Sequence, residues 1–120
     1  MARVLLVEDD QDALEIRKRI FERAGHQVVM APSVLSARDA FHADPPESVV
    51  LDLRLPDLED GLTLIREFRA ASRQLKIIVV CGWSADLDGR SEATLVDRIL
   101  SKPVRSEVLL GAIGVADRSC

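Results

Sequence analysis

Short apolar runs, set at intervals along the chain, constrain the fold more than any other feature of the sequence. They lie at residues 4–7, 28–30, 49–51 and 77–80, with a weaker run at 99–100. Three of them are unbroken rather than alternating, which is typical of strands covered on both faces, as in a parallel sheet. The sequence therefore predicts parallel strands with helices on both sides of the sheet.

Patterns typical of amphipathic helices lie between these runs. They occupy residues 11–24, 34–43, 62–72 and 106–117. Asp10 and Ser33 stand where the first two helices would begin, and both residue types cap helix N-termini. The segment between residues 83 and 97 is less regular, and its Asp-Gly pair predicts a turn. We expect a short or mobile helix there.

The spacing of apolar residues also predicts which side of each helix packs on the sheet. For the first helix the expected core stripe is Ala13, Ile16, Ile20 and Ala24, with Leu14 and Phe21 beside it. For the other helices the expected core residues are Val34, Ala37 and Phe41, then Leu62, Ile65 and Phe68, then Leu109, Ile113 and Ala116. Each set recurs at three- and four-residue intervals, as one face of a helix requires.

The alternation of strands and helices, repeated five times, predicts an α/β fold with a single doubly wound parallel sheet. Crossovers between parallel strands are right-handed, so the helices cover both faces. The 120 residues are the size of one domain, which we expect to span residues 1–120. Ligands bind such sheets at the carboxyl ends of the strands, near the point where the strand order reverses.

Charged residues and a thiol follow the predicted strands at that edge. The first run ends in Glu8 and Asp9, the third in Asp52, the fourth in Cys81, and the fifth leads into Lys102. Two carboxylates ~4 Å apart repel by roughly 4 kcal/mol at an effective dielectric of about 20. Mg²⁺ relieves this repulsion by binding carboxylates, water and phosphate oxygens. The pattern predicts a Mg²⁺ site beside an anionic ligand, with Asp52 as a nucleophile toward phosphorus.

Composition argues against several other classes of protein. The net charge is −4 without a basic stripe, so direct binding to nucleic acid is not expected. No apolar run is long enough to cross a membrane. Cys81 and Cys120 have neither metal-binding nor disulfide spacing, which favours a cytoplasmic setting. No glycine-rich turn follows the first strand, as a nucleotide- or flavin-binding domain would need.

Three motifs occur in order along the chain: VLLVEDD, VVLDLRLPDLEDG and LSKPV. Together they resemble the bacterial response-regulator receiver domains of the chemotaxis and two-component type, over essentially the whole chain. The resemblance implies a (βα)5 flavodoxin-like fold with strand order 2-1-3-4-5. It also implies a phosphorelay function, in which a sensor histidine kinase or phosphotransfer protein donates the phosphoryl group. A conformational change would then relay the signal to a downstream protein or a detached output domain.

The resemblance assigns roles to individual residues. Asp52 matches the phosphoacceptor and also touches the metal. Asp9 matches a direct Mg²⁺ ligand, whereas Glu8 acts more through water. The backbone carbonyl of Arg54 matches the main-chain metal ligand. Lys102 matches the lysine that pairs with the phosphoryl group, and the peptide bond from it to the following proline is often cis in similar domains.

This chain departs from the family pattern at several positions. Cys81 stands where the family has Thr or Ser, and a thiol is a weaker hydrogen-bond donor than a hydroxyl. We therefore expect phosphorylation to be retained but to shift the conformation incompletely. Ile99 replaces the usual Tyr or Phe, which makes output through the neighbouring face doubtful. The segment 56–61 is one residue longer than the corresponding segment common in the family. Trp83 either fills a groove or shields the acyl phosphate from water.

Two alternatives stay open at this point. The chain could be a receiver-like interaction module that acts independently of phosphorylation, as Cys81 and Ile99 favour. It could also be a Mg²⁺-dependent phosphatase with an Asp nucleophile, but such enzymes need a second Asp where Arg54 stands. A receiver domain would catalyse its own phosphoryl transfer and slow hydrolysis without turning over an external substrate, so we do not expect an enzyme in the usual sense.

Overall fold

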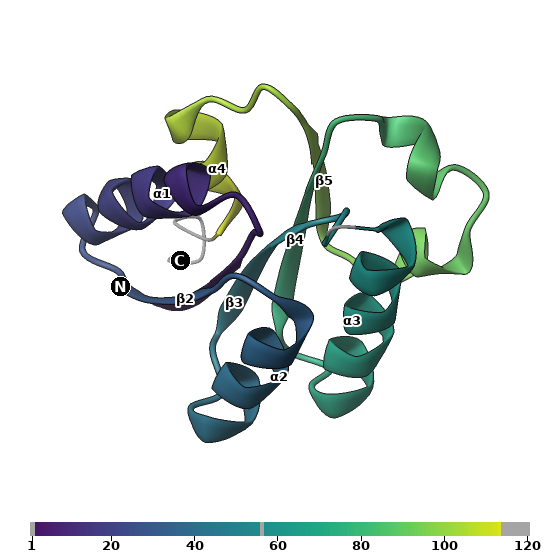
Figure 1. The fold of residues 1–120 in the computed structure, drawn as a ribbon, viewed down its shortest axis with the longest axis horizontal. Helices are drawn as coiled ribbons and strands as arrows, with labels where there is room; N and C mark the ends of the chain where they lie inside the picture. Colours follow the sequence, from purple (N-terminus) through teal and green to yellow (C-terminus); the bar gives the residue numbers. More distant parts are fainter. Residues whose placement is uncertain (1, 56, 114–120) are drawn as a thin grey trace.

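The computed structural model describes residues 2–55 and 57–113, which form one parallel sheet between two layers of helices (Figure 1). The strands are β1 (Arg3–Val7), β2 (Gln27–Ala31), β3 (Ser48–Asp52), β4 (Lys76–Cys81) and β5 (Arg98–Ser101). The α-helices are α1 (Gln11–Arg23), α2 (Val34–Ala43), α3 (Leu58–Ala71) and α4 (Ser106–Ala112). All strand pairs are parallel, in the order β2-β1-β3-β4-β5, which confirms the predicted fold.

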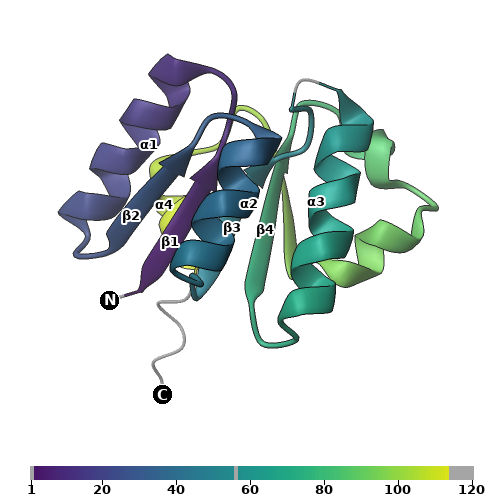
Figure 2. The same ribbon diagram turned by 60° about the horizontal axis from the view of Figure 1, so that its bottom comes forward.

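The sheet is covered on both faces, because successive side chains of each strand point to opposite sides. Helices α1 and α4 lie on one face, and α2 and α3 on the other (Figures 1 and 2). Every residue of the central strand β3 is buried. On the second face, Phe41 of α2 and Phe68 of α3 stack with ring centroids 4.4 Å apart. This two-sided core holds the strand ends in fixed relative positions.

Helix α1 begins as predicted but presents a different face to the sheet. The Asp10 carboxylate accepts hydrogen bonds from the backbone N–H groups of Asp12 and Ala13, which confirms it as the N-terminal cap. The residues that α1 buries are Leu14 and Phe21, whereas Ile16 is 58% exposed. The predicted stripe was therefore wrong. The bulky Phe21 ring adds far more buried apolar area than the alanines of that stripe, so it sets the rotation of the helix.

Helix α3 begins at Leu58, four residues earlier than the predicted start at residue 62. Its first turn is closed by Asp57 and Asp60, because the Asp57 N–H donates to the Asp60 carboxylate at 3.3 Å. Most of the segment 56–61 is thus helix rather than loop, and Pro56 itself lies outside the described residues. The core residues predicted for this helix are all buried. Those predicted for α2 are buried too, except Val34, which is half-buried.

Gly61 allows α3 to approach the end of β3 very closely. A Cβ atom placed on Gly61 would lie 1.8 Å from the carbonyl oxygen of Leu53. No side chain fits in that space, so a glycine is required for this packing. The first turn of α3 is consequently pressed against the residue that follows Asp52.

The fourth crossover contains no α-helix among its described residues. Two 3₁₀ helices take its place, η1 (Ser84–Leu87) and η2 (Ser91–Leu95), with Gly89 between them at a φ of 74°. This agrees with the short helix expected between residues 83 and 97. Leu87 is buried in the core and anchors η1. Glu92 is buried against Arg66 of α3 and anchors η2.

The C-terminal helix α4 ends at Ala112, and the core positions predicted for Leu109 and Ile113 are confirmed. The rest of the predicted helix, residues 114–117, and Cys120 lie outside the described residues. Over residues 2–55 and 57–113, no helix combines the length and the apolar character that a bilayer crossing requires.

Candidate functional site

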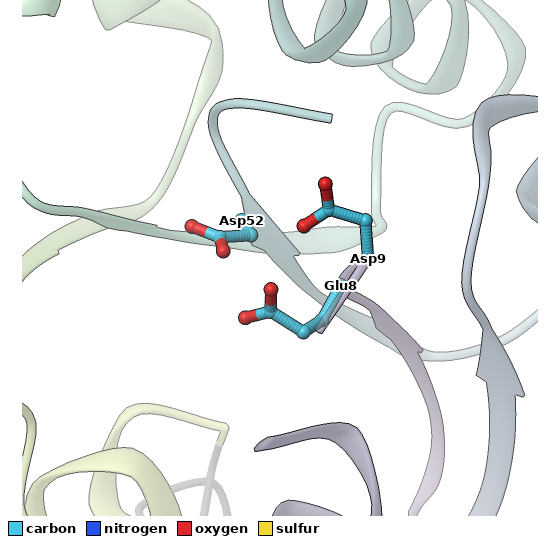
Figure 3. Close-up of side chains that lie close together, drawn as sticks. All are labelled: Glu8, Asp9 and Asp52. Atoms are coloured by element: carbon cyan, nitrogen blue, oxygen red, sulfur yellow. The ribbon is translucent and has the colours of Figure 1, made fainter. Parts of the chain in front are cut away.

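Three carboxylates meet at the carboxyl edge of the sheet. Glu8 and Asp9 directly follow β1, and Asp52 ends β3. These strands are adjacent and parallel, with Val7 beside Leu51, so their ends coincide. One carboxylate oxygen from each acid can be chosen such that all three lie within 4.8 Å of one another. Figure 3 shows the three side chains directed toward a common hollow.

Lys102 brings a positive charge to the same hollow from the edge strand β5. Its Nζ lies 2.9 Å from Oδ2 of Asp52, and the Asp52 side chain is only 6% exposed. The Lys102 backbone N–H donates to the carbonyl of Cys81 at 2.8 Å, which fixes the chain as it leaves β5. The peptide bond from Lys102 to Pro103 is cis, as the family resemblance implied. Four of the predicted site residues thus lie in one place.

Glu8 is the most buried member of the acidic group, at 2% exposed. Its Oε1 accepts a hydrogen bond from Arg17 at 3.1 Å, and its Oε2 accepts one from the Asp10 N–H at 3.1 Å. Burial, and then a hydrogen bond to the Asp52 carboxyl, raise the pKa of Glu8 to about 7. The raised pKa shows that burial beside a second carboxyl disfavours the charged form of Glu8 when no cation lies between the two. A hard divalent cation such as Mg²⁺ fits this donor set.

Asp9 and Arg54 complete the set of predicted metal ligands. Asp9 is exposed to solvent, unlike Glu8 and Asp52, so a hydrated ion could reach it. Arg54 follows Asp52 by two residues and lines the same cleft. A metal site over the end of β3 would therefore be open on the Asp9 side and closed on the Glu8 side.

An open cleft of about 980 Å³ surrounds these residues. Cys81 lies on its floor, with only 2% of the residue exposed. Burial, followed by the negative charge of Asp86, raises the pKa of the Cys81 thiol, which keeps it protonated at neutral pH. Gly82 leaves open space beside it, with nothing within 4 Å of a Cβ placed there. Trp83 is 68% exposed at the rim.

The prediction from sequence missed two residues of the site, Arg17 and Asp86. Arg17 lies between Leu14 and Phe21 on the buried face of α1, so the wrong helix rotation hid it. Asp86 belongs to η1 and makes a two-point ion pair with Arg54 across the cleft. No motif in the sequence marks Asp86. Only its distance of five residues from Cys81 suggests that it could lie near the site.

Ile99, the second departure from the family pattern, lies on β5 and is 39% exposed. It does not line the cleft around Asp52. The side chain therefore contributes little to the core and leaves a partly apolar surface on the edge strand.

Known proteins similar to this chain include receiver domains of response regulators. The model of the family described as "Response regulator receiver domain" matches residues 4–114. The chain is 31% identical over 114 residues to the response regulator receiver protein CpdR of Brucella abortus, covering 94% of each protein. It is 33% identical over 113 residues to the virulence transcriptional regulatory protein PhoP of Salmonella typhimurium, covering 92% of this chain but only 49% of PhoP.

Solved structures resemble the fold over nearly its whole length. A CheY-like response regulator receiver domain from Methylobacillus flagellatus superposes with a TM-score of 0.82 at 33% sequence identity. The match covers 95% of this chain and 99% of that structure. The similarity therefore extends over the sheet and both helical layers.

Proposed function

Because this chain belongs to the response regulator receiver domain family of two-component systems, we propose that Asp52 accepts a phosphoryl group from a phosphohistidine. The donor would be a sensor histidine kinase or a phosphotransfer protein. The signal would pass by a conformational change to a downstream protein or to an output domain. The proposed unit is one receiver domain over residues 1–120, working in the cytoplasm without direct contact to nucleic acid.

The proposed step is a phosphoryl transfer between two side chains. A carboxylate oxygen of Asp52 attacks the phosphorus, and the P–N bond to the donor imidazole breaks. The electron pair of that bond stays on the imidazole nitrogen, which takes up a proton from solvent. The product is an acyl phosphate, a form of covalent catalysis in which the protein itself is the acceptor.

The neighbouring residues would stabilise charge during this transfer. Lys102, already 2.9 Å from the Asp52 carboxylate, can pair with a phosphoryl oxygen because its side chain is 40% exposed toward the cleft. Asp9, Asp52 and the Arg54 backbone carbonyl would hold Mg²⁺ directly, and Glu8 through water. When bound, Mg²⁺ neutralises charge on the phosphoryl oxygens.

One observation supports this proposal above all others: three carboxylates and a lysine, far apart in the sequence, share one open hollow. Negative charge of this density is costly unless a cation neutralises it, and a divalent cation held there would in turn attract an anionic group such as a phosphoryl group. An external substrate has no enclosed pocket here, since the cleft is open to solvent along its rim. The geometry therefore favours an acceptor of phosphoryl groups over an enzyme that turns over a metabolite.

Labelling with a small phosphodonor such as acetyl phosphate tests the proposal. We expect one phosphoryl group per chain, seen by intact mass, and only when Mg²⁺ is present. Asp52→Asn should abolish the label because the nucleophile is lost. Asp39→Asn, an exposed position on α2, is the matched control and should label like the parent. Labelling that persists in Asp52→Asn would refute the assignment.

A second candidate is an interaction module that does not depend on phosphorylation. The observation that favours it is the pair of departures at Cys81, which lacks the hydroxyl, and at Ile99, which lacks the aromatic ring. The same experiment separates the two, since such a module would show no Mg²⁺-dependent label on Asp52.

A further inference from the structure

A two-point ion pair crosses the mouth of the cleft between the β3–α3 loop and η1. Arg54 Nε lies 3.1 Å from Oδ2 of Asp86, and Arg54 Nη2 lies 3.1 Å from Oδ1. The Asp86 side chain is 14% exposed, whereas that of Arg54 is 59% exposed. Pairs of this planar geometry are the strong and directional kind of ion pair. It is a direct polar link between the loop after Asp52 and the fourth crossover.

Both partners of this ion pair lie within the electrostatic reach of the acceptor site. They line the cleft that also contains Asp52 and Lys102. The charge of Asp86, after burial, raises the pKa of the Cys81 thiol, so Asp86 influences the floor of the cleft. A dianionic phosphoryl group on Asp52 would enter this cleft and compete with Asp86 for the Arg54 guanidinium.

Arg54 is suited to exchange one partner for the other. A guanidinium offers five N–H donors in a planar fork that matches both carboxylate and phosphate oxygens. The groups that would otherwise sense the phosphoryl group are missing, because Cys81 replaces the hydroxyl and Ile99 replaces the aromatic ring. The chain therefore lacks the usual switching residues at positions 81 and 99, but it has an arginine two residues after Asp52.

We propose that Asp86 is a positioning residue: it holds Arg54 away from Asp52 until a phosphoryl group on Asp52 takes Arg54 from it, which loosens η1. This inference rests on the proposed phosphoacceptor function of Asp52. It adds a path from the acceptor site to the fourth crossover that needs neither a hydroxyl at residue 81 nor an aromatic ring at residue 99.

The change would be confined to η1. The buried Leu87 still anchors its end in the core. Next to it, η2 is held independently, through Glu92 to Arg66 and through the Leu95 carbonyl, which accepts a hydrogen bond from Arg69 at 2.8 Å. Release of Asp86 would thus alter the rim of the cleft without unfolding the crossover.

The test uses beryllofluoride, which binds a carboxylate together with Mg²⁺ and imitates the acyl phosphate. Binding is followed by the fluorescence of Trp83, the single tryptophan of the chain. Amide hydrogen exchange of the peptide that covers η1 is measured with and without the ligand. The proteins compared are the parent, Arg54→Gln and Asp86→Asn.

In the parent, beryllofluoride should accelerate exchange in η1, because Asp86 loses its partner. In Arg54→Gln and Asp86→Asn, exchange in η1 should already be fast and should not respond to the ligand. Asp86→Asn should also bind beryllofluoride roughly 2- to 5-fold more tightly, since Arg54 no longer has to leave an exposed ion pair. Arg54→Gln should bind it more weakly than the parent.

The matched control is Glu67→Gln, which breaks a second two-point ion pair, between Glu67 and Arg38, far from the cleft. It should leave both beryllofluoride affinity and exchange in η1 unchanged. A parent that binds beryllofluoride with no acceleration of η1 exchange, or an Asp86→Asn variant that binds it more weakly, would overturn this inference alone. A parent that fails to bind beryllofluoride with Mg²⁺ would refute the phosphoacceptor function, and the inference with it.

Discussion

At the scale of single residues, the acceptor site depends on contacts that leave almost no freedom in the backbone around Asp52. Asp52 is held by Lys102 on one side and lies against the acidic pair of β1 on the other. The residue after it, Leu53, donates its N–H to the Val80 carbonyl at 3.1 Å and continues the strand pairing beyond β3. Its carbonyl faces Gly61 at the start of α3.

Gly61→Ala should therefore lower the free energy of unfolding by about 1–3 kcal/mol, the usual cost of overpacking a tight contact. The new Cβ would overlap the Leu53 carbonyl, and either α3 or the loop after Asp52 must move. Urea denaturation measures the loss. Gly82→Ala is the control, because nothing lies within 4 Å of its Cβ position and its stability should change little. Equal midpoints for the two variants would contradict this account of the packing.

Cys81→Thr should increase the conformational response to beryllofluoride. The new hydroxyl can donate to a charged oxygen, a hydrogen bond worth roughly 1.5–3 kcal/mol, whereas complete reversal of a two-state population takes about 5.5 kcal/mol. The response is measured as the ligand-induced change in amide chemical shifts. Cys81→Val is the control, because valine has the shape of threonine without the hydroxyl. A Cys81→Thr variant that responds no more than the parent would count against the incomplete switch expected from the thiol.

The sequence predicted correctly which side chains lie together where a motif or a strand end marked the residue. Glu8, Asp9, Asp52 and Lys102 each stand directly at or after a strand end, so the parallel topology alone brings them together. Asp86 has no such mark, because side-chain partners in an irregular crossover depend on the path of the chain. The sequence cannot supply that path.

At the scale of elements, the helices differ in how well the sequence determined them. The apolar residues of α3 form one clear stripe, and all of those predicted for the core are buried. Helix α1 carries apolar residues on several sides, and the buried ones, Leu14 and Phe21, are two turns apart. Periodicity alone could not choose between its two candidate faces. The choice mattered for the site, since the correct face also carries Arg17.

Arg69 of α3 joins several segments around the fourth crossover, in addition to the contact between Arg66 and Glu92. The Arg69 guanidinium donates to the carbonyls of Leu95 and Leu75, each at 2.8 Å, and to the Asp97 carboxylate at 3.0 Å. The same Asp97 oxygen accepts the Ile77 N–H at 2.8 Å. The arginine therefore joins the end of α3, the start of β4 and the end of η2.

Arg69→Met should destabilise the fold by about 2–4 kcal/mol, because it leaves several partly buried acceptors without their donor. Thermal or urea unfolding provides the measurement. Arg73→Met, at an exposed position in the connection that follows α3, is the control and should stay within about 0.5 kcal/mol of the parent. If the two variants unfold alike, the arginine does not anchor the crossover as described.

At the scale of the whole molecule, the parallel sheet converts distant sequence positions into one site. The acidic pair and the lysine are contributed by β1 and β5, and the acceptor by β3 between them. Two-sided burial keeps these strand ends in register, so the repulsion between the carboxylates cannot be relieved by spreading apart. Under the proposed function, this concentration of carboxylates would attract a cation and then a phosphoryl group.

Titration calorimetry with Mg²⁺ tests this central claim most directly. We expect one Mg²⁺ per chain for the parent, a strong loss of binding in Asp9→Asn, and unchanged binding in Asp12→Asn, whose side chain is exposed on the first turn of α1. Loss of Mg²⁺ binding in Asp9→Asn but not in the control Asp12→Asn is the result the account predicts. Equal Mg²⁺ binding by the parent and Asp9→Asn would contradict it, because the cation would then lie elsewhere than in the hollow between β1 and β3.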